Sequence, residues 1–417
     1  MCKRASAVVL CAAVLAMIVA CAPTIAAQSP RIVDSVATLP PRPANTDPGT
    51  LLAAEVFEVS DQLADAAAGA FRIRYRSTEM SGNRRTEVTG AAFVPRGTAP
   101  PDGWPIIAFA HGTTGIDPGC APSRVADLMG SDTLIAGFLQ AGYAVVATDY
   151  QGLDGDAADD VDGSRAVSGV RAHPYQDAPT AGANVIDSVR ALRNLTPTAS
   201  KRWAAMGFSQ GGGASWAATS LAGSYGDGLE LVGSVSVTPS VDTSPLAGLA
   251  AKELLSSYQL VVYLWTLIGL DRSDPAFAIG KYWHGASFAD RADVAGCSYS
   301  GADAGARERV LRTMSSGDLA LAPDEAGALA ARLEKLSVPG GGVTAPMYVV
   351  YAGRDVYIDP SWTRHAIDRE CNSGATILVK YDADAGHDSV DGSGAASWLA
   401  ERFAGRAAPS SCGKPSR

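Results

Sequence analysis

Hydrophobic and polar positions alternate along residues 71–76, where Phe71, Ile73 and Tyr75 are separated by arginines. A repeat of two is typical of a strand with one face in the core and the other in water. Residues 104–110 and 143–148 are instead almost wholly apolar, as expected of strands covered on both faces. Similar patterns predict further strands at 87–95, 203–206, 229–237, 347–351 and 376–381, and helices at 131–141, 177–195, 211–221, 361–371 and 394–403.

This alternation of strands and helices predicts the α/β class, with a mostly parallel sheet that is flanked by helices on both faces. The alternation stops between residues 240 and 342, where the pattern is helical and includes the apolar segment 253–270. We therefore expect a core in two pieces with a helical insertion between them. The predicted division is an extended arm at 28–50, core residues 51–239, the insertion at 240–342 and core residues 343–417.

The first 27 residues read as a secretory signal peptide. Lys3 and Arg4 precede an apolar run at 5–20, and small residues follow, with Ala26 or Ala27 before the cleavage point. A second interpretation is a lipoprotein leader, in which Cys21 is lipidated and anchors the protein at the cell surface. The apolar run is near the lower limit for a membrane-spanning helix. Both interpretations predict export, either as a secreted protein or as one attached to the cell surface.

Composition and cysteine usage agree with an exported globular protein. The 417 residues are 47% hydrophobic and 18% charged, which excludes wholesale disorder, and the net charge of −9 argues against nucleic-acid binding. Four of the seven cysteines lie beyond the leader, and an even number in an exported chain predicts two disulfides with three possible pairings. These four are Cys120, Cys297, Cys371 and Cys412, and none has the spacing of a metal site.

The segment Gly207-Phe208-Ser209-Gln210-Gly211 carries the candidate nucleophile. It lies between a predicted strand and a predicted helix, where a serine on a sharp turn needs small residues two positions before and after it. The pentapeptide alone is a weak signal, and its place between these two elements gives it weight. Because serine needs a base to remove its proton and a third group to orient that base, partners are expected further along the chain.

His387 is the predicted base, because it lies in a turn-rich loop just after a predicted strand. The other histidine beyond the insertion, His365, falls within a predicted helix and reads as a surface or packing residue. The predicted acid is Asp355, which follows the strand at 347–351. Its nearest rival is Asp359, whose alternative role is to cap the helix that begins beyond Pro360.

Two backbone N–H groups should stabilise the negative oxygen of a tetrahedral intermediate. One is expected from Gln210, at the start of the helix after Ser209. The second is expected from the glycine-containing loop after residues 104–110, with Thr113 as the first candidate and Thr114 as the second. His111 opens this loop and is expected to brace it.

Several motifs occur in a fixed order with the serine turn. They are Ala110-His111-Gly112-Thr113-Thr114-Gly115, Gly119-Cys120-Ala121-Pro122-Ser123, Asp149-Tyr150-Gln151-Gly152-Leu153 and His173-Pro174-Tyr175. In this order the chain resembles the secretory lipase family of α/β-hydrolases, which includes fungal lipase-A-type enzymes and exported actinobacterial lipases and esterases. The resemblance covers about residues 50–405 and implies a helical cap before the strand that bears the acid. It also implies the disulfides Cys120–Cys297 and Cys371–Cys412. Gln151 stands where that family often has Glu, so substrate contacts from its loop are expected to differ.

The expected activity is hydrolysis of carboxylic esters, either acyl esters or triacylglycerols, through an acyl-serine intermediate. Ser209 attacks the ester, His387 transfers the proton and Asp355 orients His387. No metal or organic cofactor is implied, and we expect a monomer whose partner is its ester or lipid substrate. The apolar segment 260–270 either forms the core of the cap or meets acyl chains or a lipid surface. Alternatives are a serine peptidase on the same fold and a catalytically inactive binding module at the cell surface.

Overall fold

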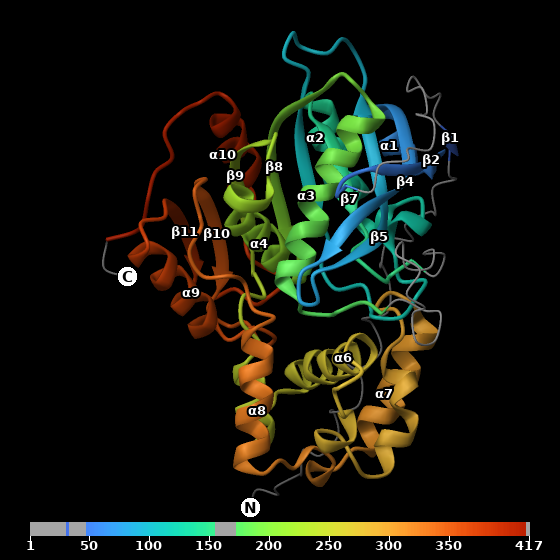
Figure 1. Cartoon of the computed structure of the whole chain (residues 1–417), viewed down its shortest axis with the longest axis vertical. Coiled ribbons are helices and arrows are strands. Elements are labelled where there is room, and N and C mark those ends of the chain that lie inside the picture. The colour runs from blue at the N-terminus through green and yellow to red at the C-terminus, as the bar shows by residue number, and fades with distance from the viewer. Residues whose placement is uncertain (1–30, 33–46, 155–171, 414–417) are drawn as a thin grey trace, which may run out of the picture.

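A nine-stranded sheet forms the centre of the computed structural model, which describes residues 31–32, 47–154 and 172–413 (Figure 1). The predicted signal peptide, Cys21 and most of the predicted arm lie outside these residues. The strand order is β11-β10-β9-β8-β6-β7-β5-β4-β2. The strands are β2 (Leu51–Val56), β4 (Ala67–Glu79), β5 (Arg84–Pro95), β6 (Trp104–Ala110), β7 (Ala144–Thr148), β8 (Ala199–Phe208), β9 (Glu230–Val237), β10 (Met347–Ala352) and β11 (Ile377–Asp382).

Strands β6 to β11 run parallel to one another, and β2, β4 and β5 extend the sheet in antiparallel order. In the middle of the parallel part, Ile107 of β6 is paired with Val145 of β7 on one side and Ala204 of β8 on the other. All five residues of β7 are buried. The alternation at 71–76 arises because Phe71, Ile73 and Tyr75 of β4 face the core, where each is at most 1% exposed.

Helices cover both faces of the sheet. Ile106 and Ala108 pack in one core with α3 and α4, whereas Ile107 and Phe109 pack in a second core with α1, α2 and α10. This division follows from the alternation of side chains along β6. The helices are α1 (Asp61–Ala66), α2 (Asp132–Gln140), α3 (Ala178–Leu195), α4 (Gln210–Tyr225), α9 (Pro360–Asn372) and α10 (Gly394–Phe403).

Residues between β9 and β10 form a separate group of helices that lies below the sheet in Figure 1. Their main elements are α5 (Pro245–Ala251), α6 (Ser257–Ser273), η4 (Ala286–Val294), α7 (Gly301–Thr313) and α8 (Pro323–Glu334). They share a hydrophobic core that includes Tyr263, Leu267, Trp283 and Leu333, and residues outside the insertion such as Ile116 also belong to it. Most of the apolar segment 260–270 is buried in this core. These helices fall within residues 240–342, which we call the insertion.

The predicted elements differ from the structure mainly at their ends and near the N-terminus. Helix α6 begins at Ser257 rather than at residue 253, because Ser256 caps it and Glu253 has a positive φ of 58°. The pattern did not predict β2 or α1, and part of the expected arm is strand β1 (Arg31–Ile32), which pairs with β3 (Glu58–Val59). Within the described residues, every helix is too short or too polar to span a membrane.

The contact between α3 and α4 provides a test of the packing. A Cβ atom on Gly182 of α3 would lie 2.7 Å from the backbone nitrogen of Ala218 in α4. Gly182→Ala should therefore force the helices apart and lower the free energy of unfolding by about 1–3 kcal/mol, measured by urea denaturation. Gly248→Ala on α5 is the control, because a Cβ there meets no atom within 4 Å. Equal effects of the two substitutions would contradict this account of the packing.

Candidate active site

Ser209 lies on the turn between β8 and α4 in a strained backbone conformation, with φ 54° and ψ −117°. A Cβ atom on Gly207 would collide with the backbone of Gly211, and one on Gly211 would collide with the carbonyl oxygen of Ala110. Only glycine therefore fits at these two positions. The Ser209 N–H donates to the carbonyl oxygen of Val237 at 2.9 Å. The turn thus holds a partly exposed serine at the carboxyl end of β8.

His387 and Asp355 form a hydrogen-bonded pair. Nδ1 of His387 lies 2.7 Å from Oδ2 of Asp355, and their side chains are only 7% and 4% exposed. The other carboxylate oxygen of Asp355 accepts hydrogen bonds from the backbone N–H groups of Tyr357 and Ile358, each at 2.9 Å. The ring of Tyr357 also lies against His387, with centroids 4.8 Å apart. The carboxylate is therefore fixed by its own turn and holds the imidazole in one orientation.

The rival residues have other positions. The carboxylate of Asp359 accepts a hydrogen bond from the N–H of Ser361 at 2.8 Å and caps α9. His365 is exposed on α9. The structure thus brings Asp355, not Asp359, to His387.

Sheet topology gathers the three predicted catalytic residues at one edge. Ser209, Asp355 and His387 follow the carboxyl ends of β8, β10 and β11, which run parallel within the same part of the sheet. The carboxyl edge of a parallel sheet is where such folds place their ligands. Among the described residues, no direct hydrogen bond joins the hydroxyl of Ser209 to His387. Catalytic contacts of this kind often tighten only when substrate binds.

The loop after β6 passes beside the serine. A Cβ atom on Gly112 would lie 3.9 Å from Cβ of Ser209, so the backbone of this loop is adjacent to the candidate nucleophile. Further along the loop, the hydroxyl of Thr113 is hydrogen-bonded to that of Tyr175 at 2.9 Å. Gln210 is the first residue of α4, so its N–H has no acceptor within the helix. Thr113 and Gln210 are therefore near the serine, and their role as oxyanion donors stays a prediction.

His111 braces the start of this loop. Its Nδ1 lies 2.6 Å from the carbonyl oxygen of Gly112, and its ring packs against Tyr150 with centroids 4.4 Å apart. The hydroxyl of Tyr150 donates to the carbonyl oxygen of His111 at 2.9 Å. Burial lowers the pKa of His111. Nearby, the carboxylate of Asp149 accepts hydrogen bonds from the hydroxyls of Ser123 and Thr89.

A second histidine, His173, contacts the side chain of Gln210. Its Nδ1 lies 2.9 Å from the carbonyl oxygen of Gln151, and its Nε2 lies 2.9 Å from Nε2 of Gln210. Because a carbonyl only accepts, Nδ1 carries the proton, and Nε2 is then the acceptor for the amide of Gln210. Burial lowers the pKa of His173 from 6.5 to about 4, which favours this neutral form.

Sequence reasoning missed the contact between His173 and Gln210. The motif His173-Pro174-Tyr175 marked the segment, but no spacing rule connects residues 37 positions apart. Among the described residues, no group of three or more His, Cys, Asp or Glu side chains is arranged to hold a metal ion.

A family model described as "Secretory lipase" matches residues 126–411, which is more than half of the chain. The chain belongs to the secretory lipase family. This agrees with the ordered motifs around Ser209 and with the resemblance noted from the sequence.

Two curated relatives are named as lipases. Over 208 residues the chain is 30% identical to a Mycobacterium tuberculosis protein named "Probable inactive lipase", a match that covers 46% of this chain and 42% of that protein. Over 178 residues it is 26% identical to lipase A of Moesziomyces aphidis, covering 40% of this chain and 34% of that one. The chain thus spans less than half the length of the curated relatives it matches.

Solved structures of this type share the fold. Candida antarctica lipase A in its closed state superposes with a TM-score of 0.69 at 20% identity, covering 89% of this chain and 87% of that one. A ligand-bound rice cell wall degrading esterase of Xanthomonas oryzae superposes with a TM-score of 0.63 at 16% identity, covering 82% and 92%. The predicted α/β-hydrolase fold, with its mostly parallel sheet flanked by helices, is confirmed.

The buried, neutral His173 makes the stability of this secretory lipase family member depend on pH. The unfolded chain takes up the histidine proton near pH 6.5, whereas the folded chain takes it up only near pH 4. Lowering the pH through this window therefore favours the unfolded state, by at most about 3 kcal/mol.

His173→Gln keeps an acceptor for Gln210 but removes this titration. We expect the difference in unfolding free energy, wild type minus variant, to fall as the pH is lowered from about 6.5 to about 4. Urea denaturation of both proteins at a series of pH values measures it. Parallel curves across that window would refute the assignment of a neutral His173.

Proposed function

We propose that this member of the secretory lipase family is a serine carboxylic-ester hydrolase that acts through an acyl-serine intermediate. One observation supports this most directly. The hydrogen-bonded Asp355–His387 pair lies at the same edge of the sheet as Ser209, which stands on a strained turn. A serine, a carboxylate and a histidine, in this order along the chain, are the parts that nucleophilic catalysis on such a fold requires.

The proposed reaction uses the contacts of this chain. His387 donates from Nδ1 to Asp355, so Nε2 is left to accept the proton of Ser209 as the hydroxyl attacks the ester carbonyl. The same nitrogen then protonates the leaving alcohol, and in the second half it activates the water that releases the acid. The N–H groups of Gln210 and Thr113 are proposed to hold the negative oxygen of both tetrahedral intermediates.

Exposed apolar side chains on the insertion and on the loop that carries Asp355 support a substrate with apolar parts. Leu254, Tyr258 and Val356 are 63%, 48% and 45% exposed. The ring of Tyr258 packs on Tyr357, which itself contacts His387. We call Leu254, Tyr258 and Val356 the apolar rim. It joins the insertion to the loop that carries the acid, and we propose that it meets acyl chains or the surface of a lipid aggregate.

The proposed setting is extracellular, as the family name and the signal-peptide pattern suggest, with the lipid-anchored form through Cys21 as the alternative. We propose that the protein works as a monomer on ester or lipid substrates. A non-catalytic binding role has one observation in its favour, since a relative is named as inactive. Ser209 and the Asp355–His387 pair favour catalysis in this chain.

Substitution of the nucleophile tests the activity itself. Wild-type protein should hydrolyse p-nitrophenyl esters, and Ser209→Ala should lower kcat/KM by about 10³-fold or more because the attacking oxygen is lost. Assays over acyl chains from acetyl to palmitoyl, beside matched amides, measure the activity and its chain-length preference. Wild-type turnover that is absent, or unchanged by the substitution, would contradict the proposal, and faster amide hydrolysis would indicate a peptidase.

The two candidate carboxylates provide a matched pair of variants. Asp355→Asn should lower kcat by about 10²–10⁴-fold, because an amide does not stabilise the imidazolium that forms at His387. Asp359→Asn should keep near-wild-type activity, because asparagine also caps a helix well. Steady-state kinetics on one soluble ester compare the two variants. A larger loss at Asp359 would reverse the assignment of the acid.

A further inference from the structure

We propose that the insertion positions the oxyanion loop, and that residues 294–300 are the part that does so. We call residues 294–300 the clasp, and residues 111–120 the oxyanion loop. The inference rests on the proposed function, because it assigns Cys297 and Ser298 as positioning residues for the same reaction. Both act through the oxyanion loop, Ser298 by hydrogen bonds and Cys297 by its disulfide.

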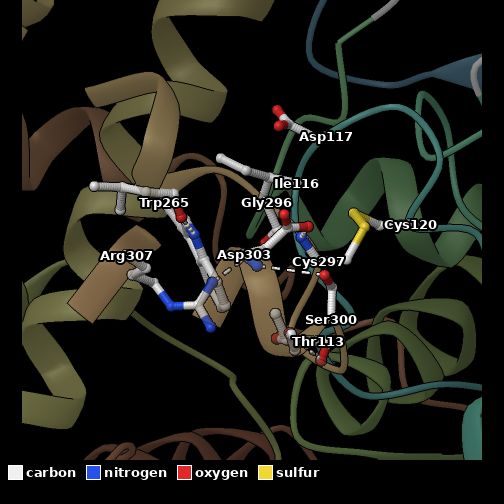
Figure 2. Close-up of a disulfide and its surroundings, with 12 residues drawn as sticks. Thr113, Ile116, Asp117, Cys120, Trp265, Gly296, Cys297, Ser300, Asp303 and Arg307 are labelled. Carbon is white, nitrogen blue, oxygen red and sulfur yellow. Dashed lines mark hydrogen bonds between the residues drawn. A yellow bond between two sulfur atoms is a disulfide. The ribbon is translucent and has the colours of Figure 1, made fainter. Parts of the chain in front are cut away.

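The clasp holds consecutive peptide groups of the oxyanion loop. The hydroxyl of Ser298 donates to the carbonyl oxygen of Thr113 at 3.3 Å, and the N–H of Ser298 donates to the carbonyl oxygen of Thr114 at 2.9 Å. The N–H of Ile116 donates to the carbonyl oxygen of Ala295 at 3.1 Å. The disulfide between Cys120 and Cys297 closes the contact (Figure 2). The partners of the Ser298–Thr113 contact are 185 residues apart in sequence.

The contacts of His111 and Ser298 restrain the two peptide groups of the loop that carry its candidate N–H donors, Thr113 and Thr114. A trans peptide is planar, so holding one carbonyl also sets the direction of the N–H of the next residue. His111 holds the carbonyl of Gly112 and thereby orients the N–H of Thr113. Ser298 holds the carbonyl of Thr113 and thereby orients the N–H of Thr114. Both candidate donors of this loop are therefore held in place, the N–H of Thr113 through His111 of the core and the N–H of Thr114 through Ser298 of the insertion.

The backbones of the oxyanion loop and the clasp approach so closely at Gly115 that no side chain fits between them. Gly115 has a φ of +119°, and a Cβ atom there would lie 2.7 Å from Cα of Cys297 and 2.8 Å from Sγ of Cys120. The glycine thus serves the contact with the clasp as well as the turn of the loop.

The clasp is itself held by the helices of the insertion. A carboxylate oxygen of Asp303, in the first turn of α7, accepts a hydrogen bond from the N–H of Cys297 at 2.9 Å (Figure 2). The indole N–H of Trp265 on α6 donates to the carbonyl oxygen of Val294 at 2.6 Å. Arg307 lies over the ring of Trp265 and donates to the carbonyl oxygen of Gly296 at 3.3 Å. The oxyanion loop is therefore coupled to α6 and α7 through the clasp.

Fixed donors matter more in the transition state than in substrate binding, because charge develops on the ester oxygen only as the reaction proceeds. Loosening the clasp should therefore lower kcat and leave KM nearly unchanged. The second disulfide, Cys371–Cys412, joins the end of α9 to the C-terminal segment, and neither cysteine belongs to the site. Removing this second disulfide is the control, because it breaks the same kind of bond away from the site.

The experiment compares two double variants in the full chain, Cys120→Ala/Cys297→Ala and Cys371→Ala/Cys412→Ala, on p-nitrophenyl butyrate. We expect the first to lower kcat by about 10–10²-fold with KM within about twofold, and to weaken inhibition by a boronic acid that forms a tetrahedral adduct with the serine. The second should keep kcat within about twofold of wild type even where its Tm falls. Equal loss of kcat in both, or no loss in the first, would overturn the inference.

Single substitutions keep the test decisive if the first double variant does not fold. Ser298→Ala removes the hydroxyl that holds Thr113 and should lower kcat by about tenfold, whereas Ser298→Thr retains a hydroxyl and should restore most of it. Identical kinetics for these two variants would overturn this inference. The proposed function would still stand, because wild-type activity and its loss in Ser209→Ala support it independently. A wild-type protein without ester turnover would overturn both.

Discussion

The whole site depends on how closely the backbone of β8 approaches the first turn of α4 and the end of β6. Gly207 and Gly211 have no side chains, so the carbonyl of Ala110, the turn at Ser209 and the start of α4 come together without a collision. This approach holds Ser209 at a positive φ and leads the chain after β6 directly past it, with Gly112 as its neighbour. Any larger residue at these glycines would move the serine, the helix N-terminus and the oxyanion loop at once.

Much of the fold was predictable because its signals are local. The strands of the parallel part are buried on both faces and read as apolar runs, and β4 shows its half-exposed face as alternation. The residues that follow such strands were good candidates for catalysis, because the ends of the strands can also be located from this local pattern. Asp355 and Asp359 were harder to separate, since both follow β10 within one loop. What separates them is a turn in which Asp355 accepts hydrogen bonds from two backbone N–H groups while it faces His387, whereas Asp359 caps α9.

Contacts between polar groups far apart in sequence were not predictable from the chain alone. His173 meets Gln210, and Ser298 meets Thr113, through single hydrogen bonds that leave no periodic pattern. The resemblance to a family implied the pairing of Cys120 with Cys297, and the structure contains it. It did not indicate that the neighbouring serine would hold the oxyanion loop. Such contacts depend on the final packing of two elements, and that packing follows from the whole fold.

The Cys120–Cys297 disulfide has a mechanical consequence for the insertion. Its helices are already joined to the core where the chain leaves β9 and where it enters β10. The disulfide adds a third covalent attachment, so the insertion cannot rotate away from the sheet about a single hinge. These three covalent attachments restrict how far the insertion can move relative to the sheet. At the margin of the insertion, the hydroxyl of Ser256 donates to the carbonyl oxygen of Val356, so a non-covalent contact links the insertion to the loop that carries Asp355.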